Sequence, residues 1–295
     1  MGTRESGLLA GAGAYLFWGV FPLYFLLIAA ASPMEVIAYR ISCSLVFSLA
    51  AAAITGQLGA LRALLHERRT FWVLAGAGVL VASNWTIYVW AVLAGHVVDA
   101  ALGYFVNPLL TALLAVVFLK EKLRPLQIAA LSLGALAVLV ISVGYGQIPW
   151  VALLLALTFG FYGLIKKQVS ASVSPLVGLT VETLPITPLA LGYIFYLQST
   201  GAGTLLHSPV HTAALLSAGI VTAVPLLLYA TAAGRIPLST LGLLQYICPV
   251  GQFLLGVLVF AEQMPPARWA GFALIWVALC VLTWDLLRGR RTVAA

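Results

Sequence analysis

The chain has 295 residues, of which 63% are hydrophobic and 8% charged, and its formal net charge is +7. A soluble domain carries charge at about 25% of its positions, so this composition excludes a water-soluble globular protein. It also excludes a disordered chain and a disulfide scaffold, because apolar content is high and the 3 cysteines all lie in apolar runs.

Apolar runs of about 20 residues, long enough to cross a hydrocarbon core of about 30 Å, recur from one end of the chain to the other. They predict an all-α polytopic membrane protein with ten transmembrane helices. The first run is longer than the apolar core of a signal peptide and is expected to remain as a helix. The expected spans are 8–30, 36–55, 71–94, 100–119, 126–143, 150–165, 176–197, 212–233, 238–260 and 267–287.

The positive residues test this span count. With both ends on one side, 13 of the 15 Lys and Arg residues fall on that side; Arg268 falls on the other, and Arg40 lies within a span. Because positive residues accumulate in cytoplasmic loops, both termini are predicted to be cytoplasmic. The basic charge then reflects contact with the lipid bilayer and its anionic headgroups, and no nucleic-acid partner is expected.

Two halves of the chain match each other, and residues 107–127 match their counterparts without gaps at a shift of 141 positions. At a shift of 141 or 142 positions the matched pairs are Pro108 with Pro249, Glu121 with Glu262, Pro125 with Pro266, Tyr88 with Tyr229, Pro33 with Pro175, and Arg40 with Glu182. These matches predict two five-helix repeats, residues 1–147 and 148–295. Because five is odd, the second repeat crosses the membrane in the opposite direction, an arrangement typical of transporters that work by alternating access.

Ionisable groups inside the expected spans are candidates for function, because the hydrocarbon core disfavours charge. Glu182 lies about 10 Å deep at the rise of a helix and is predicted either to couple protons, to bind substrate or to hold two helices together. Asp99 is the expected partner of Arg40, in a pair that gates the external end of the pathway. The alternative for Arg40 is a side chain that extends to the external headgroups.

Neutral polar and aromatic side chains in the spans are predicted either to line a cavity or to hold helices together. They are Asn84, Trp85, Tyr88, Asn107, Gln245 and Tyr246. Prolines inside spans remove backbone hydrogen bonds and are predicted hinges, above all Pro108 and Pro249 in matching spans, with Pro22 and Pro225.

These residues together resemble the drug/metabolite transporter superfamily, of the EamA type, and within it the RarD-like chloramphenicol-sensitivity proteins of bacterial inner membranes. The resemblance runs through Trp18-Gly19, Pro22-Leu23-Tyr24, Asn84-Trp85, the stretch 102–108, Glu182-Thr183-Leu184 and the stretch 237–242. It adds Trp18 and Tyr24 to the candidate substrate-binding residues. This chain departs from the family pattern at Tyr39, where His is common, and at Asp99, where Glu is common.

The resemblance implies a secondary transporter of the bacterial inner membrane. We therefore expect alternating-access transport of a small amphipathic metabolite or drug, with protons as a candidate coupling ion, by a monomer or homodimer that needs no cofactor. A passive channel or a membrane-embedded sensor is the alternative. An enzyme is not expected, because no nucleophile, metal cluster or phosphate loop is evident in the spans.

Overall fold

The computed structural model describes residues 3–119, 125–146, 148–169, 172–233, 235–236 and 244–291, and the regular structure within these ranges is helical. The helices are α1 (Thr3–Gly19), α2 (Phe21–Leu26), α3 (Pro33–Ile54), α4 (Leu58–His66), α5 (Arg68–Leu93), α6 (Val97–Leu119), α7 (Pro125–Tyr145), α8 (Trp150–Val169), α9 (Pro175–Thr183), α10 (Thr187–Thr200), α11 (Pro209–Ala233), α13 (Ile247–Leu258) and α14 (Pro266–Arg291).

The predicted all-helical membrane protein is confirmed, while the number of spans stays a prediction. Among the described residues, 5 helices are long and apolar enough to cross a bilayer, namely α3, α5, α7, α11 and α14, and the pair α9 and α10 makes up to 6. The apolar parts of α6, α8 and α13 are shorter. The expected ninth span begins in 237–243, outside the described residues, and α8 continues to Val169, beyond its expected end at 165.

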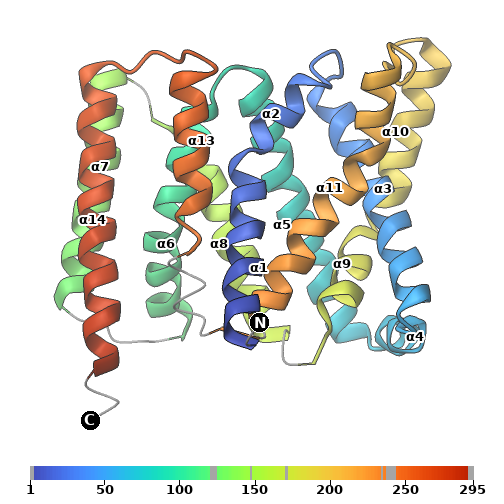
Figure 1. Ribbon diagram of the computed structural model, residues 1–295, viewed down its shortest axis with the longest axis horizontal. Helices are drawn as coiled ribbons and strands as arrows, with labels where there is room; N and C mark the ends of the chain where they lie inside the picture. Colours follow the sequence, from blue (N-terminus) through green and yellow to red (C-terminus); the bar gives the residue numbers. More distant parts are fainter. Residues whose placement is uncertain are drawn as a thin grey trace.

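The helices form one bundle in which distant parts of the chain lie side by side (Figure 1). α7 packs along α14 at one edge, α6 packs on α8 and α13, and α11 packs on α1 and α3. The start of α1 and the end of α14 lie at the same end of the bundle, here named the terminal end, together with α4. The turns that precede α3, α6, α11 and α14 lie at the other end, named the opposite end.

α3 and α9 begin in the same way. Ser32 precedes Pro33 and its hydroxyl accepts the Glu35 N–H at 3.2 Å, while Ser174 precedes Pro175 and accepts the Val177 N–H at 3.4 Å. A serine cap satisfies one of the unpaired N–H groups of the first turn, and proline at the first position loses no hydrogen bond there. The equivalent positions differ by 142, the shift that also relates Arg40 and Glu182.

Two glycines lie where helix backbones cross closely. A Cβ added to Gly78 of α5 would overlap the Glu182 backbone of α9, and one added to Gly219 of α11 would overlap the Cys43 backbone of α3. Small residues allow such close backbone approach between membrane helices. Gly78 and Gly219 are 141 positions apart.

The prolines take two kinds of position. Pro108 and Pro225 lie inside α6 and α11, as expected of kinked spans. Pro22 and Pro249 lie instead in the first turns of α2 and α13, where a proline interrupts no helical hydrogen bond, so the expected loss of a hydrogen bond does not apply to them. A sharp bend of 52° lies between α9 and α10, around Pro185.

Candidate functional site

The Arg40 side chain of α3 is buried among α2, α5 and α11, with 5% of the residue exposed. Its Nε donates a hydrogen bond to Thr222 Oγ1 of α11 at 2.8 Å. The guanidinium carbon lies 4.3 Å from the ring centroid of Trp85 and 5.1 Å from that of Phe21. Its Nη1 is buried and has no hydrogen-bond partner among the described residues. Arg40 therefore neither extends to headgroups nor has its hydrogen bonds satisfied.

The expected pair of Arg40 with Asp99 is wrong. Asp99 lies in the first turn of α6, where Oδ1 is 2.9 Å from Nη2 of Arg268 and Oδ2 is 3.3 Å from Nδ1 of His96. Arg268 lies in the first turn of α14. The sequence analysis puts this residue on the external side but does not pair it with Asp99. Since this cation is nearer than the mid-span Arg40, Asp99 joins α6 to α14 and not to α3.

Asn84 links three helices. Its amide nitrogen donates to the Leu155 carbonyl at 3.0 Å and to the Thr158 hydroxyl at 2.9 Å, and its amide oxygen accepts from the Tyr104 hydroxyl at 3.1 Å. These bonds tie α5 to α8 and α6, so the geometry favours the structural interpretation of Asn84 over a role in binding.

Other polar atoms in the bundle lack such partners. The Tyr88 hydroxyl, the Asn107 amide oxygen and the Gln252 amide oxygen are buried without a hydrogen-bond partner among the described residues. Gln252 of α13 donates through its nitrogen to the Trp18 carbonyl at 3.2 Å. Sequence reasoning missed Gln252, although an amide in an apolar helix is a signal of the same kind as Asn107. Unpaired buried polar atoms are rare in proteins, and a site where a ligand supplies the missing hydrogen-bond partner is one place where they are expected.

Glu182 forms an ion pair that the sequence analysis did not anticipate. The carboxylate is 1% exposed, and its Oε1 lies 2.6 Å from Nζ of Lys166 on α8. The Tyr162 hydroxyl donates to Oε2 at 3.2 Å. The expected span ends at residue 165, which puts Lys166 in a cytoplasmic loop. α8 instead runs past it to Val169, and the Lys166 side chain reaches the carboxylate from the terminal end of the bundle. An intramembrane carboxylate with one cation and one hydroxyl can exchange a proton when that pair separates.

The opposite end is held by Glu262, in the turn between α13 and α14. Its carboxylate accepts the backbone N–H groups of Val97 and Val98 at the start of α6, the latter at 3.1 Å, and lies 3.8 Å from Arg268. A carboxylate at a helix start satisfies unpaired N–H groups, and its negative charge is attracted to the positive end of the helix dipole. Burial raises the pKa of this carboxyl above its usual value, although the N–H groups and Arg268 oppose the rise.

A second cluster at this end joins α3 to the turn before α11. Glu35 is 1% exposed and accepts from the Thr204 N–H at 2.8 Å and the Thr204 hydroxyl at 3.0 Å. The same hydroxyl lies 2.8 Å from Nε2 of His211. The sequence does carry a signal here, since Ser32 followed three residues later by Glu35 is a capping pattern, but the carboxylate bonds to Thr204 instead of to the cap.

The remaining predicted residues are dispersed. Trp18 packs edge-on against Tyr15 at 5.6 Å between ring centroids, and the Tyr24 hydroxyl donates to the Ala214 carbonyl at 2.5 Å. Gln245 and Tyr246 lie in the turn before α13, and Tyr246 interacts with Thr283 of α14. The structure thus brings Arg40 and Trp85 together, with Tyr88 one helical turn from Trp85, and leaves Tyr246 beside α14.

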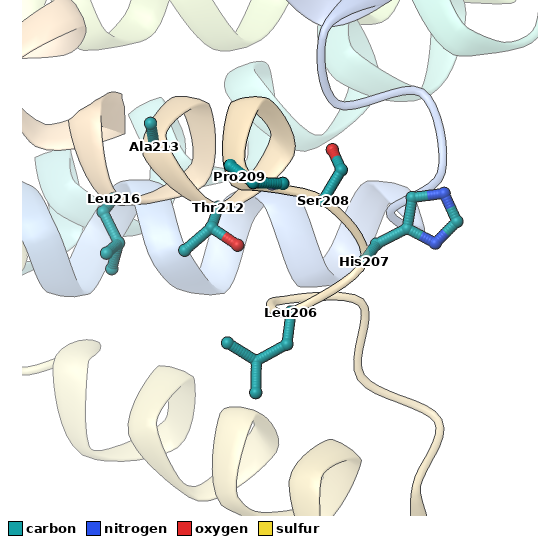
Figure 2. A pocket seen from close by; sticks show the side chains of 7 residues that line it. All are labelled: Leu206, His207, Ser208, Pro209, Thr212, Ala213 and Leu216. Atoms are coloured by element: carbon teal, nitrogen blue, oxygen red, sulfur yellow. The ribbon is translucent and has the colours of Figure 1, made fainter.

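Two depressions open at the opposite end. The larger, of about 530 Å³, lies where the turn before α11 meets that helix; Figure 2 shows Thr212, Ala213 and Leu216 on α11 and Leu206 on the turn. It is a surface feature away from Arg40. The smaller, of about 150 Å³, lies between α2 and α5 and reaches Phe25, whose ring is 5.9 Å from that of Tyr88. Phe25 therefore separates this depression from the buried polar groups.

Comparison with known proteins identifies the family. The model of the EamA-like transporter family matches residues 5–143 and again residues 148–284. The chain belongs to the EamA-like transporter family. It is 46% identical to the protein RarD of Streptomyces exfoliatus, over 98% of this chain and 91% of that one. It is 38% identical to the protein RarD of Escherichia coli, over 98% and 97%, and the predicted RarD-like resemblance is confirmed.

A further relative is described as a transporter, and a solved structure shares the fold. A protein of Pseudomonas aeruginosa described as an uncharacterized transporter is 42% identical, over 97% of this chain and 96% of that one. A crystal structure of a protein 22% identical has the same fold, with a TM-score of 0.60 over 95% of this chain and 98% of that one. This EamA-like chain is thus a multi-pass membrane protein with a transporter role. Within the described residues, no group of three His, Cys, Asp or Glu side chains could hold a metal ion.

Proposed function

We propose that the chain is a secondary active transporter that moves a small amphipathic metabolite or drug across the bacterial inner membrane by alternating access, with both termini in the cytoplasm. The observation that carries this proposal is the buried, incompletely paired Arg40 between aromatic rings, next to Thr222. Arg40 lies in the first family match and Thr222 in the second, so the site stands between the two halves of the chain.

Inverted repeats are the basis of the proposed alternation. They are supported by the equivalent caps of α3 and α9, by the equivalent close crossings at Gly78 and Gly219, and by the double match to the family model. Two copies that differ slightly in conformation can exchange those conformations, which exposes a shared site first to one side and then to the other.

The opposite end provides the contacts that must break for the site to open there. Glu262 and Arg268 from the second half hold Val97, Val98 and Asp99 of the first half. Phe25, which lines the smaller depression at this end, packs edge-on against Tyr88. Opening to the opposite side, the periplasmic side in this proposal, requires α6 to leave Glu262 and Phe25 to move aside.

Proton coupling through Glu182 is the second part of the proposal. Protonation of the carboxylate removes its attraction to Lys166 and frees the contact between α8 and α9. Binding and release of the proton on different sides would then tie the conformational cycle to the pH gradient.

Proteoliposomes test both parts. A solute is first identified by its stabilisation of the purified protein, because a ligand of the native state raises stability by mass action. We expect wild type to show counterflow of that solute and accumulation driven by an imposed pH gradient. The Glu182→Gln variant should keep counterflow and lose the pH-driven accumulation. Flux without counterflow would indicate a channel, binding without flux a sensor, and pH-driven accumulation by Glu182→Gln would refute the coupling role.

A further inference from the structure

Arg40 is a buried cation without a counter-ion. No carboxylate lies within ion-pair distance of it among the described residues, and the neighbouring acids are engaged elsewhere: Asp99 with Arg268, Glu182 with Lys166, and Glu35 with Thr204. A charged side chain deep in a membrane protein is costly unless it is paired, and chains that keep one generally use it. The missing negative charge must therefore come from outside these residues.

The surroundings of the guanidinium restrict what can supply that charge. The rings of Trp85 and Phe21 lie near it, at 4.3 and 5.1 Å from its central carbon. Nε is occupied by Thr222, which leaves Nη1 as a buried donor without an acceptor. The Tyr88 hydroxyl is also buried without a hydrogen-bond partner among the described residues, and the Tyr88 ring lies 5.8 Å from that of Tyr104 between centroids.

We propose that Arg40 binds the carboxylate of the transported solute, and that this solute is an amphipathic monocarboxylate whose apolar part packs among Trp85, Phe21 and the nearby tyrosines. The inference rests on the proposed transport function and names its substrate class. A guanidinium presents N–H groups that match the two oxygens of a carboxylate. One negative charge neutralises the single cation, and the aromatic rings accept an apolar group.

Stability without solute is the first test, because it needs no known ligand. Replacing Arg40 by the apolar Met removes an uncompensated buried charge, so the solute-free Arg40→Met protein should unfold at a temperature no lower than wild type. Thr222→Asp places a carboxylate beside the guanidinium and should raise the unfolding temperature relative to its matched control, Thr222→Asn. If Arg40→Met unfolds at a clearly lower temperature, or Thr222→Asp does not exceed its control, Arg40 is a structural residue and the proposal is overturned.

Ligand stabilisation is the second test, with 3-phenylpropionate and its amide as matched probes on the detergent-purified full chain. The carboxylate should stabilise wild type more than the amide does. The apparent affinity for the carboxylate should fall by at least roughly 30-fold in Arg40→Met, which is the lower limit for loss of one partner of a buried charge pair. It should recover in part in Arg40→Lys. Equal stabilisation by both probes, by neither of them, or undiminished carboxylate binding to Arg40→Met overturns the proposal.

Transport separates this inference from the function on which it rests. If proteoliposomes carry a neutral or cationic solute equally well with wild type and Arg40→Met, the transporter stands and the carboxylate assignment falls. If carboxylates bind at Arg40 while no solute crosses the membrane, the site stands and the transport function falls.

Discussion

The crossing of α5 and α9 at Gly78 gives a prediction with a control in the same helix. A Cβ at Gly78 would lie 2.9 Å from the Glu182 carbonyl carbon and 3.1 Å from its Cα, and would overlap the carbonyl oxygen. Backbone atoms cannot turn away as the end of a side chain can, so the helices must separate. Overpacking of this kind costs about 1–3 kcal/mol.

Gly76 is the matched control, because it lies two residues away in α5 and a Cβ there would have no atom within 4 Å. Alanine is favoured over glycine in a helix by about 1 kcal/mol, so Gly76→Ala should be neutral or stabilising. The same gain applies at position 78, so the cost of overpacking appears as the difference between the two variants. At about 2 °C per kcal/mol for a chain of this size, Gly78→Ala should unfold about 2–6 °C below Gly76→Ala in the detergent-purified protein. Tryptophan fluorescence during heating measures both variants.

Gly219 extends the test to the second half of the chain. A Cβ there would lie 2.8 Å from the Ser44 nitrogen of α3 and would overlap the Cys43 carbonyl, so Gly219→Ala should be destabilised like Gly78→Ala. Equal unfolding temperatures for the alanine variants of Gly76 and Gly78 would refute the reasoning from close backbone approach.

Three further predictions follow from the polar contacts. Lys166→Met should destabilise the protein by about 1–3 kcal/mol, because it leaves the Glu182 carboxylate without its cation. In a double-mutant cycle, adding Glu182→Gln should restore part of that loss, and additive losses would argue against the pair. Asn84→Leu should lower the free energy of unfolding by about 1–2 kcal/mol, because its hydrogen bonds are lost. Asn107→Leu replaces an amide whose oxygen has no partner among the described residues, so it should unfold near the wild-type temperature but transport less. Similar unfolding temperatures for the two variants would contradict these assignments. The folded-state pKa of Glu262 is raised, so its contribution to stability is present at low pH and is lost as pH rises through that pKa. Wild type should therefore lose stability relative to Glu262→Gln as pH rises from about 4.5. Parallel curves of stability against pH for the two proteins would disprove this prediction.

The membrane class and the approximate positions of most long helices could be predicted from sequence, because long apolar runs have few other uses. The short helix α4 was not expected, nor was the division of the expected spans 8–30 and 176–197 into two helices each. The match of Pro33 with Pro175 was visible as well, and the structure gives the helices that begin there, α3 and α9, the same serine cap. The burial of Arg40 and Glu182 followed from their depth in apolar runs.

The partners of those charges could not be predicted. Depth along the membrane normal was estimated from the helix rise, but it does not tell which helix faces which. Asp99 was therefore paired with Arg40, whereas α14 brings Arg268 to it. Lys166 was placed in a loop because the apolar run ends before it, although a long side chain at a helix end can reach back into the bundle.

The grip of Glu262 on the start of α6 has a consequence for biosynthesis. Glu262, whose carboxylate accepts the Val97 N–H, is synthesised 165 residues after Val97. The first half of the chain therefore enters the lipid while the first N–H groups of α6 have no such acceptor. Maturation of this corner is then a late event, which depends on translation of the hairpin between α13 and α14. A truncated product that stops before that hairpin would lack the acceptor of the Val97 and Val98 N–H groups.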